Sequence, residues 1–170
     1  MSIKKTVATL SLILLLQACT TNRGKVIRID PKEIRDSNAD YGSEDLHLFT
    51  KSMIQSLLRS NVLGSSTPYL TLGEIHMGRG LDEHVDTGLI KNSLRNHLLK
   101  TKKVHFLDEE LMKNNPQNVD YVLSGELHAI KKNTPTVIDN FYSLNLKLTN
   151  KKNALVVWSE EKEIRKISLK

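Results

Sequence analysis

The sequence predicts a small α/β domain of the α+β type, in which helices pack on one face of a mixed β-sheet. Three observations support this prediction. Two stretches in the middle of the chain carry apolar residues at helical spacing, and the last third alternates apolar and polar residues as strands do. Clusters of Gly, Pro, Ser and Asn separate these stretches and predict the turns between them.

The first predicted helix spans residues 43–61. Its apolar side chains recur every three or four residues and form one face: Leu46, Phe49, Met53 and Leu57, widened by Ile54 and Leu58. Ser43 is the expected N-cap, and Glu44 and Asp45 fall in the first turn, where the helix dipole favours acidic groups. The break at residues 64–68 (GSSTP) ends this element.

The middle of the chain predicts a strand, a glycine-containing loop and a second helix. Residues 69–77 form the strand, and Gly78, Arg79 and Gly80 form the loop. Asp86 is the expected cap of the second helix, whose apolar stripe and basic end are Ile90, Leu94 and Leu98, then Lys100, Lys102 and Lys103. A short strand at 104–107 and a brief helix at 108–112 follow.

The last third predicts three strands. They cover residues 121–130, 142–149 and 154–159, with a turn at 150–153. Trp158 is expected in the core, because tryptophan buries a large apolar area. We interpret Glu160 to Glu163 as a charged edge that discourages strand-to-strand aggregation.

The N-terminus carries the pattern of a secretory signal. Lys4 and Lys5 precede an apolar run of about ten residues, which is shorter than the roughly 20 residues of a membrane-spanning helix. The end of this run, Leu16-Gln17-Ala18-Cys19, resembles the lipobox of bacterial lipoproteins. This resemblance implies removal of residues 1–18 and a diacylglycerol on Cys19. Residues 19–40 are then a short acylated tether, in which residues 26–29 could pair as an edge strand, and residues 41–170 form the globular domain.

Charge and cysteine content exclude several classes of protein. Removal of residues 1–18 lowers the formal net charge from +6 to +4, and charges of both signs are interspersed. The basic block of a nucleic-acid-binding protein is missing. Cys19 is the single cysteine, so an acylated Cys19 leaves no thiol for a disulfide, metal binding or catalysis.

The remaining patterns do not predict an enzyme, a cofactor or a metal. The glycines at 73, 78 and 80 lack the sequence of a phosphate-binding loop, and we expect them to serve turns that need positive φ. His76 and His128 fall on predicted strands and could meet on a polar sheet face, but metal-ligand spacing is absent. The polar residues of these strands more simply form a solvated or partner-facing surface: Glu126, His128, Asn145 and Lys147.

The chain resembles the LpoB family of penicillin-binding-protein activators. The segments that carry this resemblance extend over about residues 41–166. They include the opening of the first helix (Tyr41-Gly42, Asp45-Leu46, Met53, Ser56-Leu57-Leu58), Glu83-His84-Val85-Asp86-Thr87, Ile90, Leu94-Arg95, Leu98, Val104-His105-Phe106-Leu107-Asp108, Asp120 to Gly125, Tyr142-Ser143-Leu144, Leu148 and Val157 to Lys166.

The resemblance implies a fold like the N-terminal domain of TolB. It also implies an outer-membrane lipoprotein, facing the periplasm, that binds a bifunctional penicillin-binding protein and stimulates peptidoglycan synthesis. Its partner would be a protein and not a small-molecule substrate. Thr20 after the cysteine looks like the sorting pattern for the outer membrane.

The predicted partner-binding surface is the loop from His76 to Glu83. The chain departs here from the Asn-x-Thr step that is usual in the family, and it also lacks the Pro-rich tether of some members. We expect Arg79 to be the anchor, with His76, Asp82 and Glu83 beside it. A second hypothesis is a structural subunit of an outer-membrane assembly, similar to the curli-secretion lipoproteins. An enzyme is the least favoured class.

Overall fold

The computed structural model describes residues 38–81, 85–108 and 119–170. Contacts divide the chain into residues 1–30 and residues 31–170, and every described residue belongs to the second unit. Its elements are α2 (Ser43–Arg59), β1 (Tyr69–Met77), α3 (Thr87–Thr101), β2 (His105–Phe106), β3 (Tyr121–Asn133), β4 (Val137–Asn150) and β5 (Val156–Leu169). The predicted edge strand at 26–29 and nearly all of the predicted helix at 108–112 lie outside the described residues.

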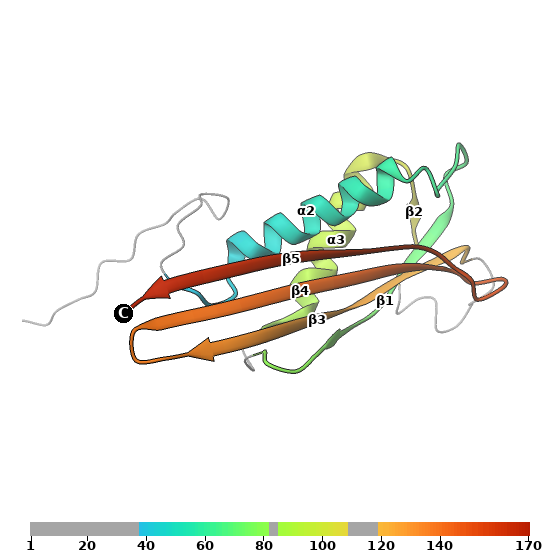
Figure 1. Cartoon of the computed structure of the whole chain (residues 1–170). Helices are drawn as coiled ribbons and strands as arrows, with labels where there is room; N and C mark the ends of the chain where they lie inside the picture. Colours follow the sequence, from blue (N-terminus) through green and yellow to red (C-terminus); the bar gives the residue numbers. More distant parts are fainter. Residues whose placement is uncertain (1–37, 82–84, 109–118) are drawn as a thin grey trace, which may run out of the picture. The chain divides into compact units, whose positions relative to one another are not determined.

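The strands form one mixed sheet in the order β2-β1-β3-β4-β5 (Figure 1). β2 and β3 both run parallel to β1, whereas β3, β4 and β5 form an antiparallel meander. The parallel part requires long connections, and α3 lies in the connection between β1 and β2. The mixed α+β class expected from the sequence is confirmed.

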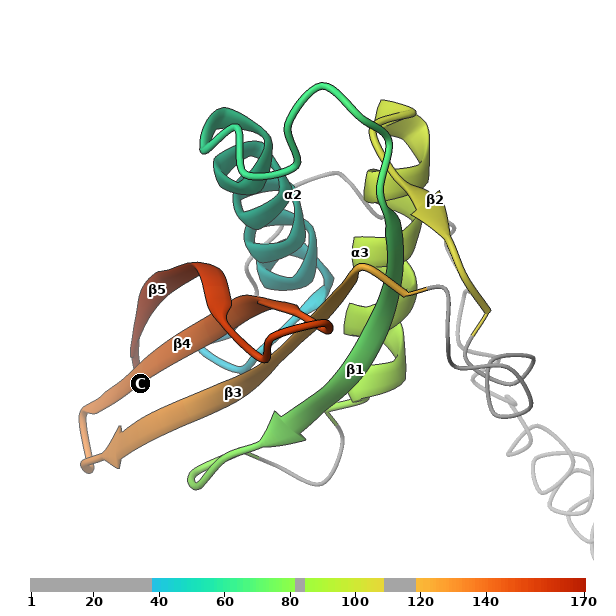
Figure 2. The ribbon, with the colours of Figure 1, turned by 90° about the vertical axis from the view of Figure 1, so that its right-hand side faces the viewer.

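Both helices lie on the same face of the sheet, α2 toward β5 and α3 toward β1 (Figure 2). The apolar stripes of both helices are buried there, as their spacing predicts. They meet the inward-facing residues of the strands: Leu70, Leu72, Leu123, Leu127, Tyr142, Leu144, Leu146 and Leu148. Trp158 is also buried in this core, as expected. No helix in the described ranges is long and apolar enough to cross a membrane.

The helix starts are nearly as predicted. Asp86 caps α3 as expected, because its Oδ1 accepts a hydrogen bond of 2.7 Å from the Gly88 N–H. The N-cap of α2 is Gly42 and not Ser43. Asp45 Oδ2 accepts the Gly42 N–H at 2.8 Å, so the carboxylate in the first turn, and not a hydroxyl at residue 43, satisfies this end of the helix.

The last strand is much longer than the sequence predicted. β5 continues through the charged residues 160–163 to Leu169 and forms one edge of the sheet. The charges on its inward side have partners: Glu160 accepts a hydrogen bond of 2.7 Å from Ser56 on α2, and Lys162 lies 2.9 Å from Glu160. Because these charges are paired, the strand need not end where the apolar pattern ends. β3 and β4 are also longer than predicted: β3 continues to Asn133 and β4 begins at Val137.

Candidate functional site

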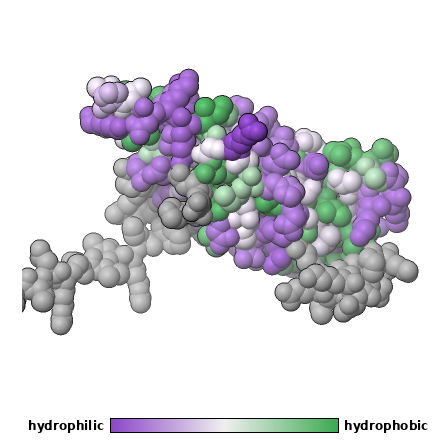
Figure 3. Space-filling model, turned by 90° about the horizontal axis from the view of Figure 1, so that it is seen from below, coloured by the Kyte–Doolittle hydropathy of each residue, from purple (hydrophilic) through white to green (hydrophobic). Residues whose placement is uncertain are grey.

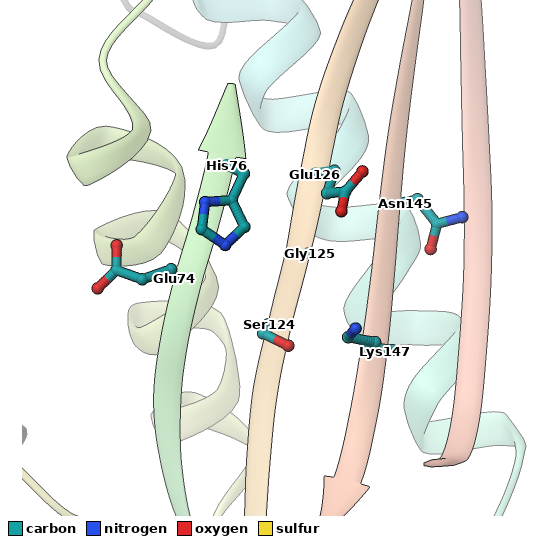
Figure 4. Close-up of a pocket in the computed structure, with 7 residues that line it drawn as sticks. All are labelled: Glu74, His76, Ser124, Gly125, Glu126, Asn145 and Lys147. Carbon is teal, nitrogen blue, oxygen red and sulfur yellow. The ribbon is translucent and has the colours of Figure 1, made fainter. Parts of the chain in front are cut away.

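In the described part of the chain, the face of the sheet opposite the helices is open and carries a polar hollow. The hollow has a volume of about 230 Å³ and is lined by seven residues of β1, β3 and β4: Glu74, His76, Ser124, Gly125, Glu126, Asn145 and Lys147. Figure 4 shows these residues on the three neighbouring strands, with the Glu74 carboxylate pointing away from the others. This carboxylate lies 3.8 Å from Nζ of Lys91 on α3. Hydrophilic residues cover much of this side of the domain, seen from below in Figure 3.

A bulge in β1 places Glu74 and His76 on the open face. Leu72 pairs with Leu123 and Ile75 with Gly125, so that Gly73 and Glu74 together stand opposite Ser124. Strict alternation after Leu72 would bury Glu74 and His76 and would expose Ile75, which is in fact only 3% exposed. A Cβ on Gly73 would lie 3.0 Å from the Ser124 Cβ, so glycine allows this close approach.

The hollow contains both acidic and basic groups. His76 is the register partner of Glu126, and Glu126 Oε2 lies 3.0 Å from Nε2 of His128. The predicted polar surface is therefore largely confirmed: Glu126, Asn145 and Lys147 line the hollow, and His128 is paired beside it. Within the described ranges, no group of three or more His, Cys, Asp or Glu is placed to hold a metal ion.

Beyond Met77 the chain stays against β3 and carries Arg79 on the surface. The Gly78 N–H donates to the Leu127 carbonyl at 2.7 Å, and the Ala129 N–H donates to the Arg79 carbonyl at 3.1 Å. The Arg79 side chain is exposed at the end of the same strand that holds His76. We call residues 76–80 the β1-end surface.

The expectation of positive φ at the glycines 73, 78 and 80 is confirmed for one of the three. Gly80 does have a φ of +83°, but Gly73 and Gly78 do not adopt positive φ. A Cβ on Gly78 would lie 1.9 Å from Nδ1 of His128, and one on Gly80 would lie 2.0 Å from the Ala129 carbonyl oxygen. Both glycines therefore allow the end of β1 to lie directly against β3.

The structure describes two of the four predicted partner-binding residues. His76 lines the hollow and Arg79 lies beyond it, at the end of the same strand. Asp82, Glu83 and the predicted lipidation site Cys19 lie outside the described residues. Sequence reasoning missed Glu74 and Ser124 as lining residues, and the signal that could have found them is Gly73 within a strand, which often marks a bulge.

The arrangement suits recognition by hydrogen bonds and charge. The lining groups offer carboxylate and amide acceptors next to an ammonium and an imidazole. Such a surface can bind a polar segment of another molecule.

The fold and these surfaces define a class of small α+β domains with two helices on one sheet face and a polar second face. Within it, the family model "Peptidoglycan-synthase activator LpoB" matches residues 113–164. The C-terminal domain of LpoB from Escherichia coli has the same fold, with a TM-score of 0.52 and 14% identity over 71% of this chain and 98% of that domain. The family-model match over residues 113–164 and the shared fold agree with the resemblance found in the sequence.

Two further solved structures are similar at a lower level. The LpoB C-terminal domain from Salmonella enterica has a TM-score of 0.46 and 11% identity, over 71% of this chain and 96% of that domain. The lipoprotein GNA1162 from Neisseria meningitidis has a TM-score of 0.44 and 15% identity, over 61% of this chain and 85% of that one. No curated protein matches the chain in a sequence search.

Proposed function

We propose that this chain is a lipid-anchored activator that binds a bifunctional penicillin-binding protein and stimulates its synthesis of peptidoglycan. The match of the LpoB family model to residues 113–164 is the observation that carries this proposal. This range includes β3, β4 and the larger part of β5. It therefore includes five of the seven residues of the polar hollow: Ser124, Gly125, Glu126, Asn145 and Lys147.

The anchor in this proposal is the acylated Cys19, and the protein needs no other cofactor. The lipid would hold the domain at the periplasmic face of the outer membrane, with the short tether between them. Activation follows from differential affinity, because a ligand raises the activity of an enzyme only if it binds the active form more tightly than the inactive form. The activator itself then contributes contacts and no chemistry.

The proposal is tested by the rate of glycan polymerisation. Each bifunctional synthase of the source cell is assayed with its lipid-linked precursor in detergent, with and without the mature lipidated chain. We expect a several-fold higher rate for at least one synthase and direct binding to the same enzyme. If no synthase is accelerated at saturating concentrations of the chain, the proposed function is wrong.

Binding of variants to the same synthase tests whether the β1-end surface is part of the interface. Arg79→Glu reverses an exposed charge and is expected to weaken synthase binding roughly tenfold, because like charges across an interface repel. Lys151→Glu, on the turn between β4 and β5, is the matched control and should leave the affinity unchanged. An Arg79→Glu variant that binds as tightly as the wild type would remove this surface from the interface but would leave the activation itself standing.

A further inference from the structure

The surfaces of α2 and α3 that face away from the sheet carry an apolar groove. This groove is separate from the polar hollow on the other face of the sheet. The groove has a volume of about 640 Å³ and is lined by eleven residues of the two helices: Glu44, Leu46, His47, Leu48, Lys51, Leu89, Asn92, Ser93, Asn96, His97 and Lys100. Figure 2 shows the two helices next to each other above the sheet. We call this feature the α2–α3 groove.

Small polar residues hold the helices together at the groove. Thr50 Oγ1 and Ser93 Oγ lie 2.9 Å apart, and Thr50 is completely buried. Because both side chains are short, the two helices approach closely here, and the longer side chains on either side form the walls. The groove is therefore built by the packing of the helices and does not depend on a flexible loop.

Two leucines on the walls are left in contact with water. Leu48 is 58% exposed and Leu89 is 55% exposed, although each lies next to a buried apolar stripe. A second hollow of about 300 Å³, next to the start of both helices, shares Leu46 and Leu89 with the groove. The apolar floor thus continues toward Tyr41, whose buried hydroxyl has no hydrogen-bond partner in the described part of the chain.

Two of the three charged residues that line the groove are basic. Lys51 and Lys100 line it from opposite helices and Glu44 is acidic, while Asp40 and Asp86 line the adjoining hollow at the start of the helices. Leu89, Ser93, Asn96 and Lys100 follow one another at spacings of four, three and four, so they share one face of α3 over about 16 Å of helix. A helix of about three turns matches this length.

We propose that the α2–α3 groove binds an acidic amphipathic helix of a partner protein. Apolar residues of that helix, spaced three or four apart, contact Leu48 and Leu89, and its acidic residues pair with Lys51 and Lys100. A concave site with walls on two helices favours an inserted helix over a flat lipid surface. This inference goes beyond the proposed activation of a synthase and uses a different surface from the polar hollow.

Site-specific photocrosslinking in cells tests the proposal on the full-length chain. A benzophenone amino acid replaces the exposed Asn96 in the groove, or Lys132 on the open sheet face as the control position, and mass spectrometry maps the crosslinked segment. We expect an Asn96-specific adduct with a segment that has net negative charge and apolar residues at helical spacing. A basic or non-amphipathic segment, a lipid adduct, a second copy of this chain or no Asn96-specific adduct would each overturn the proposal.

Charge reversal sharpens the test. Lys51→Glu with Lys100→Glu is expected to lower the Asn96 crosslink about tenfold, whereas Lys132→Glu with Lys151→Glu changes the total charge equally and should have no effect. Exchange of acidic residues of the mapped segment for lysine should restore the crosslink to the first variant. If that variant does not fold by circular dichroism, the milder Lys51→Gln with Lys100→Gln replaces it. Polymerisation rates are measured separately, so failure of this proposal is distinct from failure of the activation.

Discussion

Lys166 and Asp45 form a buried ion pair that connects β5 with the start of α2. Their Nζ and Oδ2 atoms are 2.9 Å apart, and their side chains are only 8% and 5% exposed. Lys166 also donates to the Asp40 carbonyl at 2.8 Å, and Asp45 accepts the Gly42 N–H at 2.8 Å. Each charge therefore has additional hydrogen bonds that offset the cost of its burial.

Lys166→Met is expected to lower the free energy of unfolding by about 3 kcal/mol, because it leaves a buried carboxylate without its counter-ion. Chemical denaturation measures this loss. Addition of Asp45→Asn should recover part of it, since the amide carries no charge. Arg165→Met is the control on the same strand: its pair with Asp139 is exposed, so it should cost much less. Equal losses for both variants would contradict the special role of the buried pair.

Asp120 connects the start of β1 with the start of β3. Its Oδ2 accepts the Tyr69 N–H at 3.0 Å, and Lys152 lies 3.3 Å from Oδ1. The hydrogen bond from Tyr69, followed by the contact with Lys152, lowers the pKa of Asp120 below its usual value. In the unfolded chain an aspartate titrates near 3.9, so the folded state holds this proton more weakly than the unfolded state does.

The depressed pKa gives the stability a defined pH dependence. The contribution of Asp120 is complete above about pH 5 and is lost as the pH falls through the folded-state pKa. We expect Asp120→Asn to cost about 1 kcal/mol at pH 7, discounted for its partial exposure, and to cost progressively less below about pH 4. Denaturation at pH 7 and pH 3 measures both values. A difference from wild type that is independent of pH would contradict this assignment.

At the scale of elements, the end of β1 depends on how closely it approaches β3. The positive φ of Gly80 and the short distance that would separate a Cβ there from the Ala129 carbonyl both disfavour a side chain at this position. Gly64 provides a contrast, because it has a φ of +65° but open space where a Cβ would lie. A comparison of alanine substitutions at Gly64 and Gly80 therefore separates the free-energy cost of the backbone conformation from that of a steric clash.

Gly80→Ala is expected to destabilise the domain by about 2 kcal/mol or more, since it combines strain at positive φ with a clash against backbone. Gly64→Ala carries the strain alone and should cost about 1 kcal/mol. Thermal denaturation of the two variants compares them. Hydrogen exchange at Ala129, whose N–H donates to the Arg79 carbonyl, should accelerate in Gly80→Ala only. Unchanged exchange there would show that the close approach is not needed.

At the scale of the whole molecule, the domain has two surfaces of different chemistry. The open sheet face is polar and carries the hollow and the β1-end surface, while the helical face carries an apolar groove with basic residues. The proposed lipid anchor is a third, separate part of the chain. If these three parts act independently, a substitution that abolishes the function of one should leave the functions of the other two unchanged.

Cys19→Ser tests this independence. The variant is expected to lose its lipid and its membrane association, because a diacylglycerol supplies the anchoring energy, while it still stimulates the synthase in detergent. Mass spectrometry and membrane fractionation measure the first effect and the polymerisation assay measures the second. A wild-type protein that retains residues 1–18 and a free thiol would contradict the anchor.

Much of the architecture could be predicted because local patterns determine it. The apolar stripes of α2 and α3 and the cap at Asp86 lie where their spacing and side-chain chemistry place them, as does the strand 69–77. The alternation in β4 correctly predicted the buried row from Tyr142 to Leu148. The polar surface at Glu126, Asn145 and Lys147 also follows from alternation, since every second residue of a strand faces the same side.

The tertiary structure decided what depends on partners distant in sequence. β5 continues past Ser159 because Ser56 and Asp45 on α2 bind its charged residues, and no local pattern reveals those partners. His76 reaches the open face because a bulge against Ser124 shifts the alternation. The sequence by itself determined the two helices, the positions of the main strands and most of the buried apolar residues, through spacing and side-chain chemistry. Only packing decided where charges are satisfied and which face each site residue occupies, because those depend on contacts between elements.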